Sequence, residues 1–229
     1  MRNAFGLSIP QTVEDACDPT RMAVLIYDMQ VGIVRQIPDG DTIVQACVRL
    51  RDAARESGFR VFYTRHMSLP IAASGVSQVR TAMQWQRVDD PAELRVSFPQ
   101  GSPQYQLVPE LSPNADEVVF DKITMSAFAA TPLDFALRDC GIDTFAIAGI
   151  AMEVGIEPTV RHSLDLGYLP IVVADACGAG HPAAAERSRA TLEFTGSTLT
   201  TDTPTLTDLM TRDPLAVDPL PSLVTRRST

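Results

Sequence analysis

Five short apolar runs, separated by longer segments with helical spacing, constrain the fold of this chain more than any other feature. The runs lie at 22–27, 60–64, 117–121, 144–149 and 170–175. Continuous apolar runs of this length are typical of strands buried on both faces. Between them, apolar residues recur with helical spacing at 41–57, 131–140, 157–167 and 182–194. This alternation predicts right-handed crossovers and an α/β fold, a doubly wound parallel sheet with helices on both faces.

The length of 229 residues, with 45% hydrophobic residues, is enough for a sizeable core. We predict a single domain over 1–211, with an N-terminal extension at 1–20 and a proline-containing tail at 212–229. The stretch 67–113 is too long for an ordinary connection and has helical spacing only around 77–87. Insertions of this kind often shape a binding site, so we expect it to contribute to one.

The charge balance argues against several partners. The chain has 19 basic and 28 acidic residues and a formal net charge of -9, which repels phosphate backbones and anionic lipid. It has no apolar run of membrane-spanning length and no signal-peptide pattern at its start. We therefore expect a cytoplasmic protein that binds neither nucleic acid nor membrane. The four cysteines, at 17, 47, 140 and 177, are far apart and are predicted to be reduced thiols.

The most distinctive single residue is Lys122. Of the 19 basic residues, 18 are arginines and Lys122 is the one lysine. Ligands of open parallel sheets bind at the carboxyl ends of the strands, where Asp28 follows the first run and Lys122 the third. If they meet in a partly dry cleft, each will favour the charged form of the other. A purely structural ion pair is the alternative.

The fourth apolar run leads into GIAMEVGIEPTVRHSLDLGY. Proline is tolerated only in the first turn of a helix, so Pro158 places the helix start near Glu157. Gly155 then lies on the turn between strand and helix, the elbow. Hydrolytic α/β folds often present a nucleophile at such an elbow, beside free backbone N–H groups of the helix. Gly155 provides no nucleophile.

Four motifs together resemble the isochorismatase-like hydrolase superfamily. They are DMQ after the first strand, VVFDKITMSAF, the elbow segment and VVADAC, and the resemblance covers about residues 20 to 210. It implies a Rossmann-like, six-stranded parallel sheet, a homo-oligomer (a dimer or tetramer) and a catalytic site built from Asp28, Lys122 and the elbow position Gly155. It also implies a non-proline cis peptide around Ile150, Ala151 and Met152.

The elbow departs from that of the family's cysteine hydrolases, which carry a nucleophilic cysteine there. Isochorismatases proper also have glycine and cleave a vinyl ether without a covalent intermediate. The resemblance then implies that Asp28 is a neutral general acid and that Lys122 binds a substrate carboxylate or orients Asp28. We expect a hydrolase of a small, carboxylated metabolite, in secondary metabolism. Two alternatives stay open: amide or carbamoyl hydrolysis by an activated water, and an inactive homologue that binds a metabolite or a protein.

Further residues are candidates for binding the substrate. Arg65 and Arg87 are candidates to clamp carboxylates, Trp85 and Phe128 to wall the pocket, and His66 to make a polar contact. Elbow-side and strand-end candidates complete the set: Gln30, Met152 and Glu153, the last as a second acid or base. Metal-binding members of the family use an aspartate and histidines after the second strand. Only RHMSLP follows that strand here, so we expect no metal and no cofactor.

Overall fold

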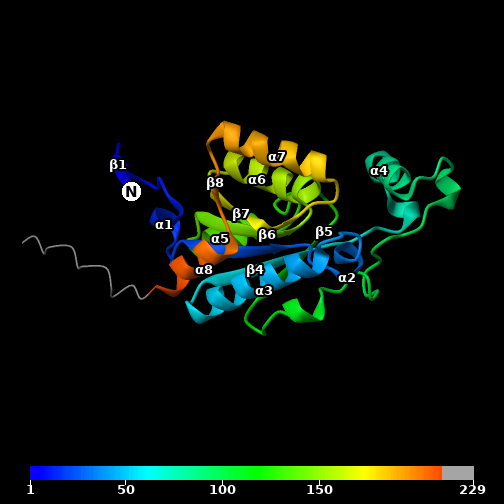
Figure 1. Ribbon diagram of the computed structural model, residues 1–229. Coiled ribbons are helices and arrows are strands. Elements are labelled where there is room, and N and C mark those ends of the chain that lie inside the picture. The colour runs from blue at the N-terminus through cyan, green and yellow to red at the C-terminus, as the bar shows by residue number, and fades with distance from the viewer. Residues whose placement is uncertain (213–229) are drawn as a thin grey trace, which may run out of the picture.

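The computed structural model describes residues 1–212 and contains a six-stranded sheet in the order β5-β4-β3-β6-β7-β8 (Figure 1). All neighbouring strands pair in parallel. The strands are β3 (Met22–Tyr27), β4 (Arg60–His66), β5 (Val118–Lys122), β6 (Thr144–Ile150), β7 (Leu169–Gly178) and β8 (Leu199–Thr201). The predicted doubly wound α/β fold is confirmed. The sixth strand, β8, is not among the five apolar runs because it is a three-residue edge strand.

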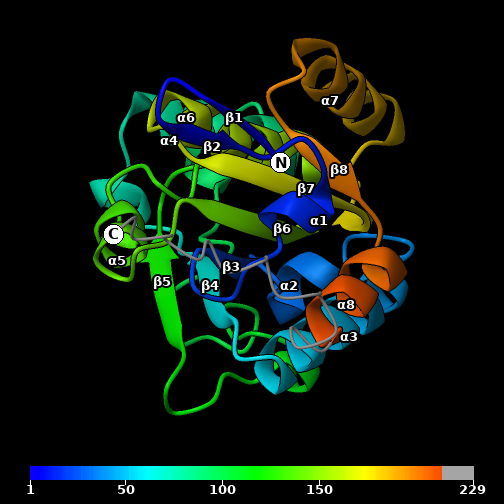
Figure 2. The same ribbon diagram turned by 90° about the vertical axis from the view of Figure 1, so that its left-hand side faces the viewer.

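Helices cover both faces of this sheet (Figures 1 and 2). On one face lie α3 (Gly40–Glu56) and α8 (Thr203–Thr211), and on the other α5 (Leu133–Asp139), α6 (Glu157–Asp165) and α7 (Pro182–Thr195). Alternate residues of β3 point to opposite faces, so Val24 joins the core under α3 while Leu25 joins the core under α6. This explains why β3 is apolar along its whole length.

The N-terminal extension has structure of its own. Strands β1 (Arg2–Ala4) and β2 (Leu7–Ile9) form an antiparallel hairpin, and the short helix α1 (Val13–Ala16) follows. At the other end, the predicted tail lies from residue 213 onward outside the described residues. Within residues 1–212, no helix has both the length and the apolar character needed to cross a membrane.

The insertion at 67–113 contains the helix α4 (Val76–Gln86) and three short 3₁₀ turns, η1 (Ile71–Ala73), η2 (Pro91–Glu93) and η3 (Pro109–Leu111). Helix α4 agrees with the helical spacing around 77–87. Figure 1 shows α4 standing apart from the helical layers, beyond the end of the sheet. None of its residues is fully buried. Helix α4 therefore adds little to the core, whereas Val108 and Leu111 at the end of the insertion are buried in it.

Two strand ends differ from their predicted limits. Strand β5 includes Lys122 as its last residue, and β7 continues through Asp175 and Cys177 to Gly178. Asp175 accepts hydrogen bonds from the backbone N–H and the hydroxyl of Thr203, at 2.7 and 2.9 Å, and so anchors the start of α8. Cys177 is 2% exposed and is a core residue. The segment after the fifth apolar run thus serves packing.

Candidate active site

Asp28 and Lys122 form a buried ion pair across β4. Lys122 Nζ lies 2.6 Å from Asp28 Oδ2, and Thr64 Oγ1 of β4 donates to Asp28 Oδ1 at 2.6 Å. The two charged side chains are only 1% and 5% exposed. Asp28 adopts a φ of 49°, in the left-handed region that aspartate tolerates better than most residues. Each carboxylate oxygen of Asp28 accepts a hydrogen bond, Oδ2 from Lys122 and Oδ1 from Thr64.

The ammonium of Lys122 has two further neighbours. Nζ donates to the carbonyl of Thr124 at 3.1 Å and lies 4.4 Å from the centre of the Tyr27 ring. A compact ammonium reaches a carboxylate, a carbonyl and a ring face at once, whereas the planar fork of a guanidinium is larger and directional. This geometry gives a physical reason for lysine at this position in a chain otherwise rich in arginine.

The elbow forms where the sequence predicts it. Strand β6 ends at Ile150, the Ile150–Ala151 peptide is cis, and a single π turn, η4 (Met152–Ile156), leads into α6 at Glu157. The backbone N–H groups of Val154, Gly155 and Ile156 all donate to the carbonyl of Ala151, at 3.0 to 3.3 Å. These donors are used within the turn, so they are not free to bind an oxyanion.

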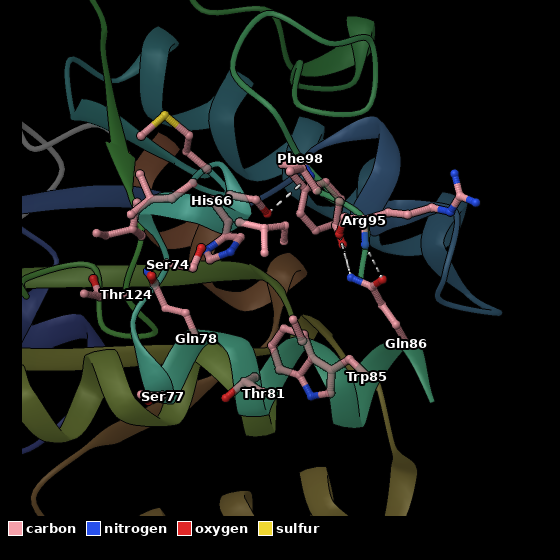
Figure 3. Close-up of a pocket in the computed structure, with 18 of the residues that line it drawn as sticks. His66, Ser74, Ser77, Gln78, Thr81, Trp85, Gln86, Arg95, Phe98 and Thr124 are labelled. Carbon is pink, nitrogen blue, oxygen red and sulfur yellow. Dashed lines mark hydrogen bonds between the residues drawn. The ribbon is translucent and has the colours of Figure 1, made fainter. Parts of the chain in front are cut away.

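A pocket of about 380 Å³ lies next to the ion pair, between α4, the end of β4, and the segments 95–98 and 123–125 (Figure 3). Figure 3 shows His66 and Phe98 on one side and Gln78, Thr81 and Trp85 of α4 on the other. The rings of His66 and Phe98 meet edge to face, with centroids 6.0 Å apart. Asp28 and Lys122 do not line the pocket, and their side chains are almost completely buried.

His66 connects the pocket to the ion pair. It is in register with Lys122 in the neighbouring strand and lies two residues beyond Thr64, on the same face of β4. Burial lowers the pKa of its imidazole below the ordinary 6.5; the charge of Asp28 opposes this shift and that of Lys122 adds to it. A neutral imidazole therefore faces the pocket near neutral pH. Gln30 fixes the strand end, since its amide exchanges two hydrogen bonds with the His66 backbone, at 2.6 and 2.9 Å.

Of the remaining candidate substrate-binding residues, Trp85 lines the pocket, whereas Gln30 and the two arginines do not. Gln30 is fully buried and also donates to the carbonyl of Tyr105 at 2.8 Å, so its side chain is held between two backbone segments. Arg65 pairs with Asp121 at 2.8 Å. Arg87 ends α4 in a left-handed conformation.

The elbow-side candidates also lie away from the pocket lining. Phe128 is 5% exposed and packs against Phe145 in the core, and Met152 is fully buried in the same cluster. Glu153 Oε1 accepts a hydrogen bond from the backbone of His181. Glu153 Oε2 is buried without a hydrogen-bond partner among the described residues.

Sequence reasoning missed Thr64, Tyr27 and Phe98. The threonine that ends the second apolar run, two positions before His66, was a usable signal for Thr64. For Phe98 there was none, because the folding of the insertion decides where it lies. Within residues 1–212, no group of three or more His, Cys, Asp or Glu side chains is arranged to hold a metal ion.

A six-stranded parallel sheet, a strand-end Asp–Lys pair and a cis-peptide elbow are the features that the resemblance to the isochorismatase-like superfamily implies. Residues 22–203 match the model of the isochorismatase domain, and the chain belongs to this family.

Similar proteins are named for different activities. The chain is 29% identical over 177 residues to the uncharacterized isochorismatase family protein YwoC of Bacillus subtilis, covering 77% of this chain and 86% of that protein. It is 42% identical over 84 residues to the ureidoacrylate amidohydrolase RutB of Klebsiella pneumoniae, a match that spans 37% of this chain and about a third (36%) of that relative. A cysteine hydrolase structure from Pseudomonas syringae is 26% identical, with a TM-score of 0.71 over 85% of this chain and 94% of that one.

Proposed function

We propose that this protein hydrolyses a C–N or C–O bond to an acyl carbon of a small metabolite, by direct attack of water activated at His66. The observation that carries the proposal is the position of His66, which lines the pocket and stands beside the Asp28–Lys122 pair. The amidohydrolase name of a partial relative supports the reaction class.

The residues suit a base-assisted addition of water. The neutral His66 imidazole takes one proton from the water, and the water oxygen bonds to the acyl carbon. The imidazolium then returns the proton to the leaving nitrogen or oxygen as its bond to carbon breaks. Asp28 favours the transient imidazolium through its negative charge. Lys122 and Thr64 hold the Asp28 carboxylate in place.

A thiol nucleophile is not part of this mechanism. None of the four cysteines lies in the pocket lining, and Cys47 and Cys177 are buried in the core. Burial raises the pKa of the Cys177 thiol to about 12, which keeps it from forming a thiolate near neutral pH. Water is the nucleophile that the site can accommodate.

Among the described residues, the pocket offers no cationic side chain for the carboxylate that we expect on the substrate from the sequence. Arg95 is one of the lining residues, but Figure 3 shows its guanidinium pointing away from the pocket. The lining includes the neutral polar side chains of Ser74, Gln78 and Thr81 instead. A substrate carboxylate would therefore need Lys122, which is already paired with Asp28.

Acid-assisted vinyl-ether hydrolysis is the second candidate, favoured by the isochorismatase domain match and the glycine at the elbow. There Asp28 would protonate the vinyl carbon, and water would capture the cation. This route requires Asp28 to leave its ion pair and reach the substrate as a neutral acid. The closed Asp28–Lys122 pair also fits a third candidate, a homologue that binds a metabolite without turnover.

A substrate panel with pH profiles separates these candidates. Small amides, carbamoyl compounds, esters and vinyl ethers are incubated with the wild type, His66→Gln, Asp28→Asn and the control His181→Asn, which keeps a capping side chain at the start of α7. We expect amide or ester turnover that rises with pH as His66 loses its proton, and a loss of about 10²-fold or more in His66→Gln.

The contrary outcomes are distinct. Turnover of vinyl ethers alone, falling as pH rises, would support Asp28 as the acid. Amide turnover that survives His66→Gln would remove His66 from the mechanism. Binding without turnover of any panel member would favour the inactive homologue.

A further inference from the structure

The space beside the elbow glycine is already filled. A Cβ atom built on Gly155 would lie within 3.0 Å of the hydroxyl oxygen and two ring carbons of Tyr27, closer than real Cβ atoms come to other heavy atoms. Gly155 is not in a left-handed conformation, so backbone strain is not the reason for glycine here. The obstacle to a side chain is the Tyr27 phenol itself.

Tyr27 is held firmly in this position. It is the last residue of β3, it is 2% exposed, and its hydroxyl donates to the carbonyl of Met125. Burial, together with the negative charge of Asp28, raises the pKa of the phenol well above its ordinary value, so the hydroxyl keeps its proton. The ring cannot swing away without breaking this bond and leaving the core.

The same side chain contacts both the ion pair and the wall of the pocket. Its ring face lies under the Lys122 ammonium, 4.4 Å from Nζ, and its hydroxyl holds Met125, which lines the pocket. Tyr27 thus fills the elbow, packs under the Lys122 ammonium and anchors the pocket wall.

We infer that Tyr27 occupies the place of an elbow side chain and acts as a positioning residue for Lys122 and the 123–125 pocket wall, so that Tyr27 and Gly155 together exclude a nucleophile at the elbow. The inference does not depend on the substrate or on His66. It implies that Gly155 and Tyr27 are coupled: no residue larger than glycine fits at 155 unless residue 27 becomes smaller.

A double-substitution cycle tests the coupling. Gly155→Ala adds only the Cβ atom, and Tyr27→Val removes the phenol while keeping a β-branched strand residue. We expect Gly155→Ala to lower the urea midpoint strongly in the wild-type background and to have little effect in the Tyr27→Val background. Equal effects in both backgrounds, or a wild-type midpoint in Gly155→Ala alone, would overturn the inference.

Thiol chemistry provides a readout that a general packing defect would not give. In Tyr27→Val/Gly155→Cys, the new thiol lies in the space vacated beside Lys122, whose positive charge favours the thiolate. We expect iodoacetamide near neutral pH to alkylate position 155 of this double variant at least about tenfold faster than Cys177, as measured by peptide mass spectrometry. A folded Gly155→Cys single variant whose introduced thiol reacts as quickly would contradict the inference.

A conservative variant tests whether the ring or the hydroxyl of Tyr27 is the obstacle at the elbow. Tyr27→Phe keeps the ring under Lys122 and loses only the bond to Met125. Because its ring still fills the elbow, Tyr27→Phe should tolerate Gly155→Ala as poorly as the wild type does. Relief of the Gly155→Ala defect by Tyr27→Phe would show that the ring is not the obstacle.

Discussion

The Lys122 ammonium lies 2.6 Å from Asp28 Oδ2, and each of the two side chains is almost completely removed from solvent. Removing one partner of such a pair leaves a buried charge without compensation, at a cost of about 3–5 kcal/mol. We predict that Lys122→Met lowers the free energy of unfolding by about this amount, as measured by urea denaturation. The double variant Asp28→Asn/Lys122→Met should lose much less than the sum of the two single losses. Strictly additive losses would show that the pair is not coupled.

Thr64 donates the second side-chain hydrogen bond to the Asp28 carboxylate. Its hydroxyl donates to Oδ1 at 2.6 Å, and its side chain is fully buried. Thr64→Val keeps the shape but leaves that oxygen without a donor, so we predict a loss of about 1–3 kcal/mol in the free energy of unfolding. Thr64→Ser, which retains the hydroxyl, is the matched control. A Thr64→Val variant as stable as Thr64→Ser would mean that the bond contributes nothing.

His66 links stability to pH. Its pKa is lowered in the folded protein, so the unfolded chain binds the proton more readily. The corresponding stability is fully present above the unfolded pKa of about 6.5 and is lost as pH falls below it towards the folded value. We predict a steeper decline in the free energy of unfolding between about pH 7 and pH 5 for the wild type than for His66→Gln. Parallel slopes in urea titrations of the two proteins would refute this.

Alkylation of the cysteines tests whether a thiol takes part in the reaction. Cys17 and Cys140 are partly exposed, whereas Cys47 and Cys177 are buried, and none lines the pocket. We predict that iodoacetamide treatment near neutral pH leaves the turnover of any substrate found with the panel unchanged. Mass spectrometry of the treated protein reports which thiols reacted. Loss of turnover in step with the labelling of one cysteine would return a thiol to the mechanism.

Trp85 is the one tryptophan in the sequence and lies on the pocket, 54% exposed. A ligand that enters the pocket shields the indole from water, so we predict a saturable change in tryptophan emission during titration with a panel compound. Trp85→Phe should lose the signal. If a substrate saturates turnover while the emission of Trp85 stays constant, the substrate binds outside this pocket.

The apolar runs at 22–27 and 144–149 were enough to predict buried parallel strands, since such strands need side chains that exclude water on both faces. The strand-end positions of Asp28 and Lys122 likewise follow from the sequence, and the parallel sheet brings them to one edge. The elbow was located from Pro158, because proline is restricted to the first turn of a helix.

Only the tertiary structure decided what surrounds those residues. It placed Phe98 against His66 and turned Arg65 towards Asp121, outcomes that depend on how the 67–113 insertion and β5 pack against β4. It also brought the Tyr27 phenol against Gly155, although 128 positions separate them in the sequence. Local patterns fix which residues lie at the edge of the sheet, because strand period and helix capping are short-range. Which side chains touch there is set by long-range packing, which no local pattern encodes.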